Sequence, residues 1–122
     1  MGVDQRQYLR VNHQQEIQLE TASRLKLVAR SENISTGGIG ITCDQVTAQA
    51  IMPAGYRVTP DPSLHLSVRL MLGDSMLAAT CSIQNSYRLA ENSYSFNLKF
   101  IALEQASLQV LDGFMKTQKN DG

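Results

Sequence analysis

Alternation of apolar and polar residues with a period of two constrains the fold of this chain more than any other feature. The clearest run covers residues 64–72, where leucine or valine occupies every second position. Such a period places the apolar side chains on one face of a β-strand. Runs of the same kind cover residues 77–83 and 94–100. The sequence Gly-Asp-Ser at 73–75 predicts a turn that joins the first two runs as a hairpin.

Shorter alternating runs in the first third of the chain predict three more strands. They cover residues 17–19, 25–29 and 39–43, and the third follows a glycine pair directly. Six strands joined mostly by short turns are typical of an antiparallel barrel or curled sheet. Residues 47–63 hold all 3 prolines of the chain and predict a long loop, with a helical turn over residues 46–51.

The period changes to that of a helix only near the C-terminus. Between residues 103 and 119, alanine, valine, leucine, phenylalanine and methionine recur on one face at the 3.6-residue spacing. This helix would cover an open end of the barrel or the surface of a neighbouring protomer, so a homodimer is one arrangement that it would allow. Without a repeat or a linker, residues 1–122 are predicted to form a single domain.

Composition excludes several classes of function. The 11 basic side chains balance 11 acidic ones, whereas a general nucleic-acid binder shows a basic face. No run approaches the roughly 18–20 apolar residues that span a bilayer, and the N-terminus lacks the apolar core of a signal peptide. We therefore expect no nucleic-acid partner, no membrane insertion and a cytoplasmic location.

Cys43 and Cys81 lie in separate strand patterns and are predicted to be buried, reduced thiols.

Catalytic chemistry has little support in the sequence. His13 and His65 do not belong to the cluster of ligands that a metal site needs, and both are predicted to lie on the surface. No serine has the strand-turn-helix context of a nucleophile elbow. We expect no catalytic residue, no metal and no cofactor, and therefore not an enzyme; a barrel carrier for a small apolar ligand is a weaker option.

Two short motifs point to ligand binding. Arg6 and Arg10 form R-x-x-x-R, and residues 33–38 read NISTGG, which is N-x-S-x-x-G. Guanidinium groups bind phosphate bidentately, stack on flat rings and match the O6/N7 edge of guanine. The second motif combines an amide, a hydroxyl and glycine backbone. Together they predict a clamp for a small guanine nucleotide, although surface arginines and a polar turn would be the simpler interpretation of each motif alone.

With these two motifs in this order, residues 4–119 resemble a PilZ domain, the bacterial receptor module for cyclic di-GMP. The resemblance implies an all-β fold, a six-stranded antiparallel PilZ-type β-barrel with a C-terminal α-helix. It also implies a set of contacts to cyclic di-GMP. These contacts are Arg6, Arg10, Asn33, Ser35 and Gly38, with lesser ones from Gln5 and Gly37.

The chain departs from the family pattern at two positions. Gln5 stands where many members have a basic residue, which bears on affinity and on whether one or two nucleotides bind. Asn97 stands where many have glycine in the last strand. The resemblance implies a regulatory receptor whose N-terminal segment is fastened by the nucleotide and which signals to an unidentified protein, in motility, biofilm or polysaccharide control. The alternative is a nucleotide-independent adaptor of the same fold, as in pilus assembly, but such proteins tend to lose both motifs.

Overall fold

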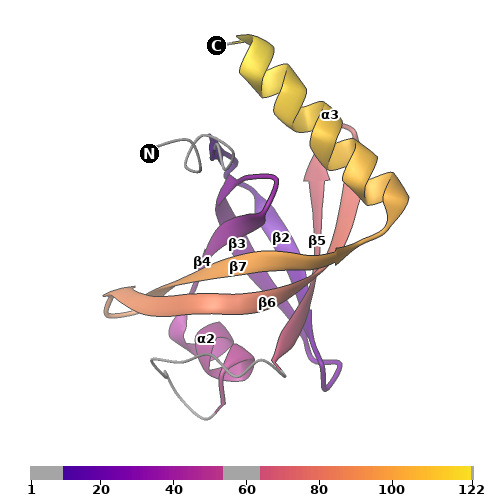
Figure 1. Ribbon diagram of the computed structural model, residues 1–122. Coiled ribbons are helices and arrows are strands. Elements are labelled where there is room, and N and C mark those ends of the chain that lie inside the picture. The colour runs from indigo at the N-terminus through magenta and orange to yellow at the C-terminus, as the bar shows by residue number, and fades with distance from the viewer. Residues whose placement is uncertain (1–9, 54–63, 122) are drawn as a thin grey trace, which may run out of the picture.

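Seven strands and two helices make up the computed structural model, which describes residues 10–53 and 64–121 (Figure 1). All strand pairs are antiparallel. In chain order the elements are β1 Val11–Asn12, β2 Glu16–Thr21, β3 Lys26–Ile34, β4 Gly38–Cys43, α2 Gln45–Ile51, β5 His65–Leu72, β6 Ser75–Ala90, β7 Ser93–Leu103 and α3 Gln105–Asp121.

The strands other than β1 close into a barrel. They pair in the order β3-β2-β5-β6-β7-β4, and a pairing of β4 with β3 completes the ring. Within the described residues, the short β1 pairs only with β3, and it lies on the same side of β3 as β2. The predicted six-stranded antiparallel barrel with a C-terminal helix is therefore confirmed.

The alternating residues of the sequence form the barrel core. In β5 every second side chain from Leu66 to Leu72 is buried and those between are exposed. Ile39 and Ile41 of β4 and Phe96 of β7 are completely buried. Burial of each such side chain contributes about 1.5–3 kcal/mol, so the period-two pattern is also the main source of stability.

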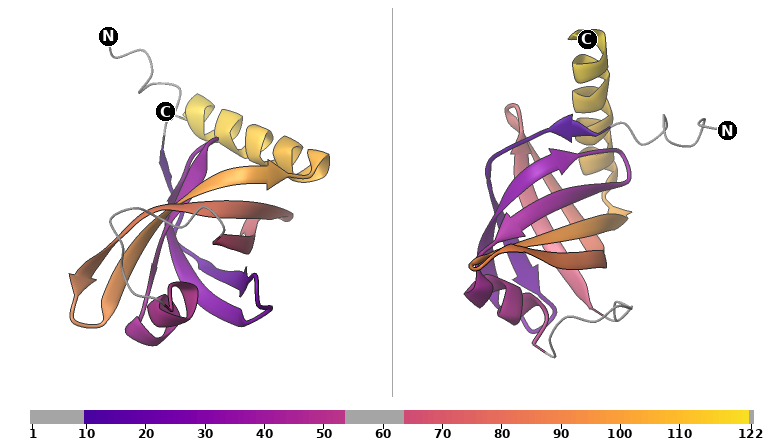
Figure 2. Two further views of the ribbon diagram at one scale, coloured as in Figure 1. Left: turned by 60° about the horizontal axis from the view of Figure 1, so that its bottom comes forward. Right: turned by 90° about the vertical axis from the view of Figure 1, so that its left-hand side faces the viewer.

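The two helices lie at opposite ends of the barrel (Figure 2). Helix α2 begins after Asp44, whose carboxylate accepts a hydrogen bond from the Thr47 amide at 2.8 Å. This bond lowers the pKa of Asp44. The helical turn predicted over residues 46–51 is confirmed. Helix α3 covers the other end through the buried side chains of Leu111 and Met115. None of the helices in the described ranges is long and apolar enough to cross a membrane.

Several strands differ from the sequence prediction. Strand β3 continues to Ile34, beyond the predicted end at residue 29, so Asn33 lies in the strand and not in the turn. Strand β1 has only two residues, too few to show an alternation. Strand β6 continues to Ala90, well beyond the predicted end at residue 83. Most side chains of its second half are exposed. Strand β5 pairs only with residues 75–82 of β6, so the rest of β6 has β7 as its one neighbouring strand among the described residues.

His13 is buried, so the prediction of a surface position was wrong. The segment between β1 and β2 carries its ring beneath α3, where it meets Phe114 edge-on with centroids 6.0 Å apart. Its Nδ1 is 2.8 Å from the Ser31 hydroxyl and its Nε2 is 2.9 Å from the Met71 carbonyl oxygen. Both ring nitrogens therefore have hydrogen-bond partners, which offsets the free-energy cost of burying a polar ring. His65 is exposed, as predicted.

The two cysteines are free thiols in different environments. Cys81 is completely buried, as predicted, whereas Cys43 is only half-buried. Burial raises the pKa of each thiol to about 12. Both therefore stay protonated near neutral pH and are poor nucleophiles.

Candidate ligand-binding site

Within the described residues, the two sequence motifs meet through one hydrogen bond. Nη1 of Arg10, just before β1, donates to Oδ1 of Asn33 at 2.5 Å, across a separation of 23 residues. The pairing of β1 with β3 sets this geometry, because Asn12 lies opposite Asn33 in the register. Arg6 and Gln5 lie outside the described residues.

The Ser35 hydroxyl organises the turn between β3 and β4. It accepts hydrogen bonds from the amides of Gly37 and Gly38, both at 3.2 Å. The Ser35 amide in turn donates to the Gly38 carbonyl at 2.9 Å. With 1% of its surface exposed, Ser35 has a structural reason to be serine; its contact with a ligand, and that of Gly37, stay predictions.

Two glycines of β4 are required for different reasons. A Cβ at Gly38 would lie 2.1 Å from the Leu98 carbonyl oxygen, so glycine here permits close approach of β4 to β7. A Cβ at Gly40 would lie 2.9 Å from Asn33 Oδ1. Gly40 therefore makes room for the Asn33 amide. The contact of Gly38 with a ligand stays a prediction, and the role of Gly40 was missed because it depends on the β3–β4 register.

Asn33, Asn97 and Asn85 lie on one line of paired residues that crosses neighbouring strands of the barrel. Asn33 pairs with Gly40, Gly40 with Asn97, and Asn97 with Asn85. Nδ2 of Asn97 donates to Oδ1 of Asn85 at 2.6 Å. The β3–β4 register shifts beside Asn33 and the β6–β7 register shifts beside Asn85. Such bulges re-aim side chains and are common next to binding sites.

A hollow of about 380 Å³ lies over this line of residues. Its volume falls within the range of roughly 300–1,000 Å³ that small-molecule sites occupy. The amides of Asn33 and Asn97 line it on one side. Tyr87 and Leu89, whose surfaces are 51% and 52% exposed, provide an apolar wall. The combination of a flat aromatic ring with hydrogen-bonding groups suits a nucleobase.

The electrostatics of the hollow are asymmetric. Among the described residues, Glu32 is the only charged side chain that lines it. The guanidinium of Arg10 lies at its edge, on Asn33. A ligand with an anionic part and a hydrogen-bond-donating part would therefore bind in one orientation, with the anionic part toward Arg10.

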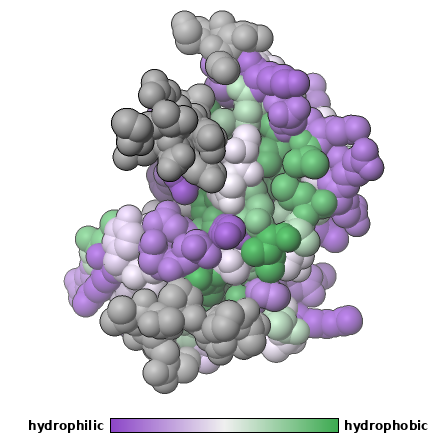
Figure 3. All heavy atoms as spheres, viewed as in Figure 1, coloured by the Kyte–Doolittle hydropathy of each residue, from purple (hydrophilic) through white to green (hydrophobic). Residues whose placement is uncertain are grey.

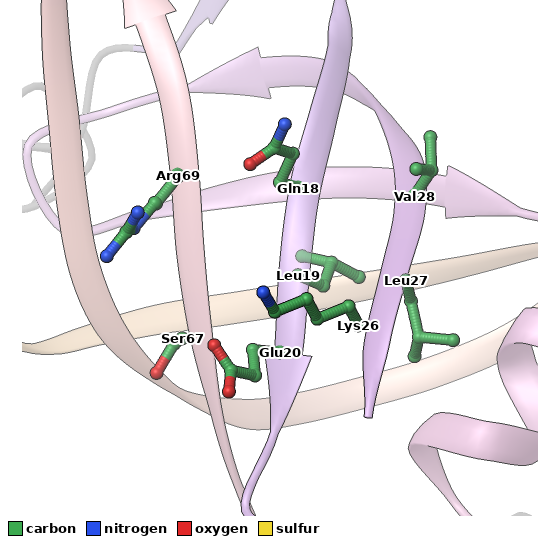
Figure 4. Close-up of a pocket in the computed structure, with 8 residues that line it drawn as sticks. All are labelled: Gln18, Leu19, Glu20, Lys26, Leu27, Val28, Ser67 and Arg69. Carbon is green, nitrogen blue, oxygen red and sulfur yellow. The ribbon is translucent and has the colours of Figure 1, made fainter. Parts of the chain in front are cut away.

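Another hollow, of about 450 Å³, lies on the outer face of β2, β3 and β5 (Figure 4). Gln18 and Glu20 on β2, Lys26 on β3 and Arg69 on β5 line it. It mixes both signs of charge and contains no residue of either motif. Residues 10–53 and 64–121 hold no cluster of three or more His, Cys, Asp or Glu side chains that could bind a metal ion. Because Asn33 of the second motif lines the hollow of about 380 Å³ and no motif residue lines the other, the hollow beside Asn33 is the preferred candidate site.

Comparison by sequence finds no relative: no protein-family model matches the chain, and no curated protein matches it. Comparison of structures does find related folds. An inhibitor of motility from Bacillus subtilis, MotI/DgrA, aligns with a TM-score of 0.65 and 18% identity over 93% of this chain. The PilZ domain of YcgR from Escherichia coli, solved with c-di-GMP, aligns with a TM-score of 0.63 and 10% identity over 93% of this chain and 91% of its own.

MrkH from K. pneumonia, solved as a c-di-GMP complex, aligns with a TM-score of 0.66 and 10% identity over 93% of this chain. The chain spans about half the length of MotI/DgrA and of MrkH, 51% and 52% respectively. Barrel topology and terminal helix define a small closed β-barrel with a C-terminal helix. More particularly, the chain has the fold of PilZ domains.

Proposed function

We propose that this chain is a regulatory receptor for cyclic di-GMP. The observation that carries the proposal is the Arg10–Asn33 hydrogen bond at the edge of the hollow, which joins the two motifs at one place. The YcgR domain and MrkH, whose fold the chain shares, are described with c-di-GMP bound, and this favours the same ligand here.

The proposed binding mode follows from the charges. Among the described residues, Arg10 donates one hydrogen bond, to Asn33. A guanidinium carries five donors, and we assign others of them to phosphate. Arg6 supplies the second guanidinium, and a guanine occupies the hollow against Asn33 and Tyr87. Each hydrogen bond to a charged group contributes about 1.5–3 kcal/mol net. Four or five such bonds support micromolar or tighter binding, about −8 kcal/mol.

Signalling by this chain would follow from ordering. The nucleotide would hold the segment with Arg6 and Arg10 against the barrel and so change the surface offered to a protein partner. Apolar surface is visible on the face shown in Figure 3. Ile101 and Leu108, 44% and 52% exposed, lie near the junction of β7 and α3, and a partner or second protomer would find apolar contacts there. Hydrogen exchange of residues 4–14 is expected to slow on ligand addition.

Isothermal titration tests the proposal. Wild-type protein is expected to bind cyclic di-GMP, and Arg10→Ala and Arg6→Ala are each expected to lose about 2 kcal/mol, roughly 30-fold in affinity. Arg69→Ala is the matched control, because Arg69 is exposed and lines the other hollow. Equal affinities for wild type and Arg10→Ala would refute the binding mode. Absence of binding by the wild type would favour the nucleotide-independent adaptor.

A further inference from the structure

Glu32 brings a carboxylate into the hollow through an irregularity of β3. Ser31 pairs with Ile41 and Asn33 pairs with Gly40, so Glu32 is the extra residue of a β-bulge. In a regular strand, adjacent side chains point to opposite faces. The bulge instead lets Glu32 and Asn33, neighbours in the chain, line the same hollow.

Two side chains of the described residues hold the Glu32 carboxylate in place. Its Oε2 accepts a hydrogen bond from the Thr42 hydroxyl at 2.9 Å, and its Oε1 accepts one from Nε2 of Gln14 at 3.2 Å. A carboxylate has about four acceptor positions on its two oxygens. Each oxygen therefore keeps acceptor capacity for a ligand, on a group whose orientation its neighbours restrict.

The charge of Glu32 selects which part of a nucleotide it contacts. A phosphate would be repelled, so the contact must be with hydrogen-bond donors. The Watson–Crick edge of guanine presents N1–H and the N2 amino group side by side, which match the two oxygens of a carboxylate. Adenine presents an acceptor at N1 and would leave a lone pair facing Glu32, which is costly.

We propose that Glu32 is the specificity-determining residue of this site and accepts hydrogen bonds from N1–H and the N2 amino group of a guanine. This inference rests on the proposed binding of cyclic di-GMP. Glu32 and Arg10 then act as opposite poles: the base edge is directed to Glu32 and the phosphates to Arg10.

Removal of one donor from the ligand tests the contact. Cyclic di-IMP differs from cyclic di-GMP only in lacking the N2 amino groups. Titrations with both nucleotides are compared for wild type, Glu32→Gln and the control Glu104→Gln, which removes the same charge from an exposed residue outside the hollow. The wild type and the control are expected to prefer cyclic di-GMP by about tenfold or more, and Glu32→Gln by less than about threefold.

If Glu32 had only a structural role, Glu32→Gln would weaken the binding of both nucleotides equally and leave the ratio of the two affinities unchanged. An unchanged ratio would therefore overturn the inference. Equal affinity of the wild type for the two nucleotides would overturn it as well, without any need for the variant to fold. In either case, binding of cyclic di-GMP by the wild type would leave the proposed function intact. If the wild type did not bind cyclic di-GMP, both the proposed function and the inference about Glu32 would be refuted.

Discussion

Replacement of Gly40 by alanine separates ligand binding from folding. The new methyl carbon would lie 2.9 Å from Oδ1 and 3.2 Å from Nδ2 of Asn33, so the amide must shift, and we expect its hydrogen bond with Arg10 to be distorted. Only the end of a side chain is displaced, and alanine regains about 0.5–1 kcal/mol of glycine's entropic cost. We expect the melting temperature to change by less than about 5 °C.

The same substitution should affect binding far more. The displaced Asn33 amide can neither orient Arg10 nor hydrogen-bond a base, and loss of one such contact costs about 1.5–2 kcal/mol. We expect Gly40→Ala to bind cyclic di-GMP about 10- to 30-fold more weakly in isothermal titration.

Gly38→Ala is the matched comparison, two residues away on the same strand. Its methyl carbon would lie 2.1 Å from the Leu98 carbonyl oxygen, and a paired backbone cannot rotate away. Overpacking of this kind costs about 2–3 kcal/mol, so calorimetry should show a melting temperature about 6–15 °C lower. Unchanged binding by Gly40→Ala, or unchanged melting of Gly38→Ala, would refute this reasoning.

Two further predictions concern the interior. His13→Ala removes one buried and one partly buried hydrogen bond and the contact with Phe114. It should lower the free energy of unfolding in urea by about 2–4 kcal/mol; a loss under about 1 kcal/mol would contradict the burial of His13. Because the pKa of both thiols is raised to about 12, Cys43 and Cys81 should react with a disulfide reagent at pH 8 much more slowly than in unfolded protein. Rapid labelling of the native protein would contradict the burial that raises the pKa of these thiols.

The order of strands along the chain and the terminal helix could be predicted from the sequence alone. Burial on one face imposes a period of two on a strand and 3.6 on a helix, and this local signal is strong in residues 64–72 and 103–119. The two motifs also placed Arg10 and Asn33 in one predicted clamp, and in the structure a hydrogen bond joins these two side chains; their contact with a ligand stays a prediction. The ends of elements were less certain, as β6 shows, because an exposed strand has no alternation to read.

Only the tertiary structure decided which residues come together at the candidate site. Asn33, Gly40 and Asn97 come together through the registers of three strands, and Glu32 joins them through a bulge. His13 is buried because a segment between strands passes under α3. Each of these depends on pairing between residues far apart in the chain, and no local period encodes that pairing.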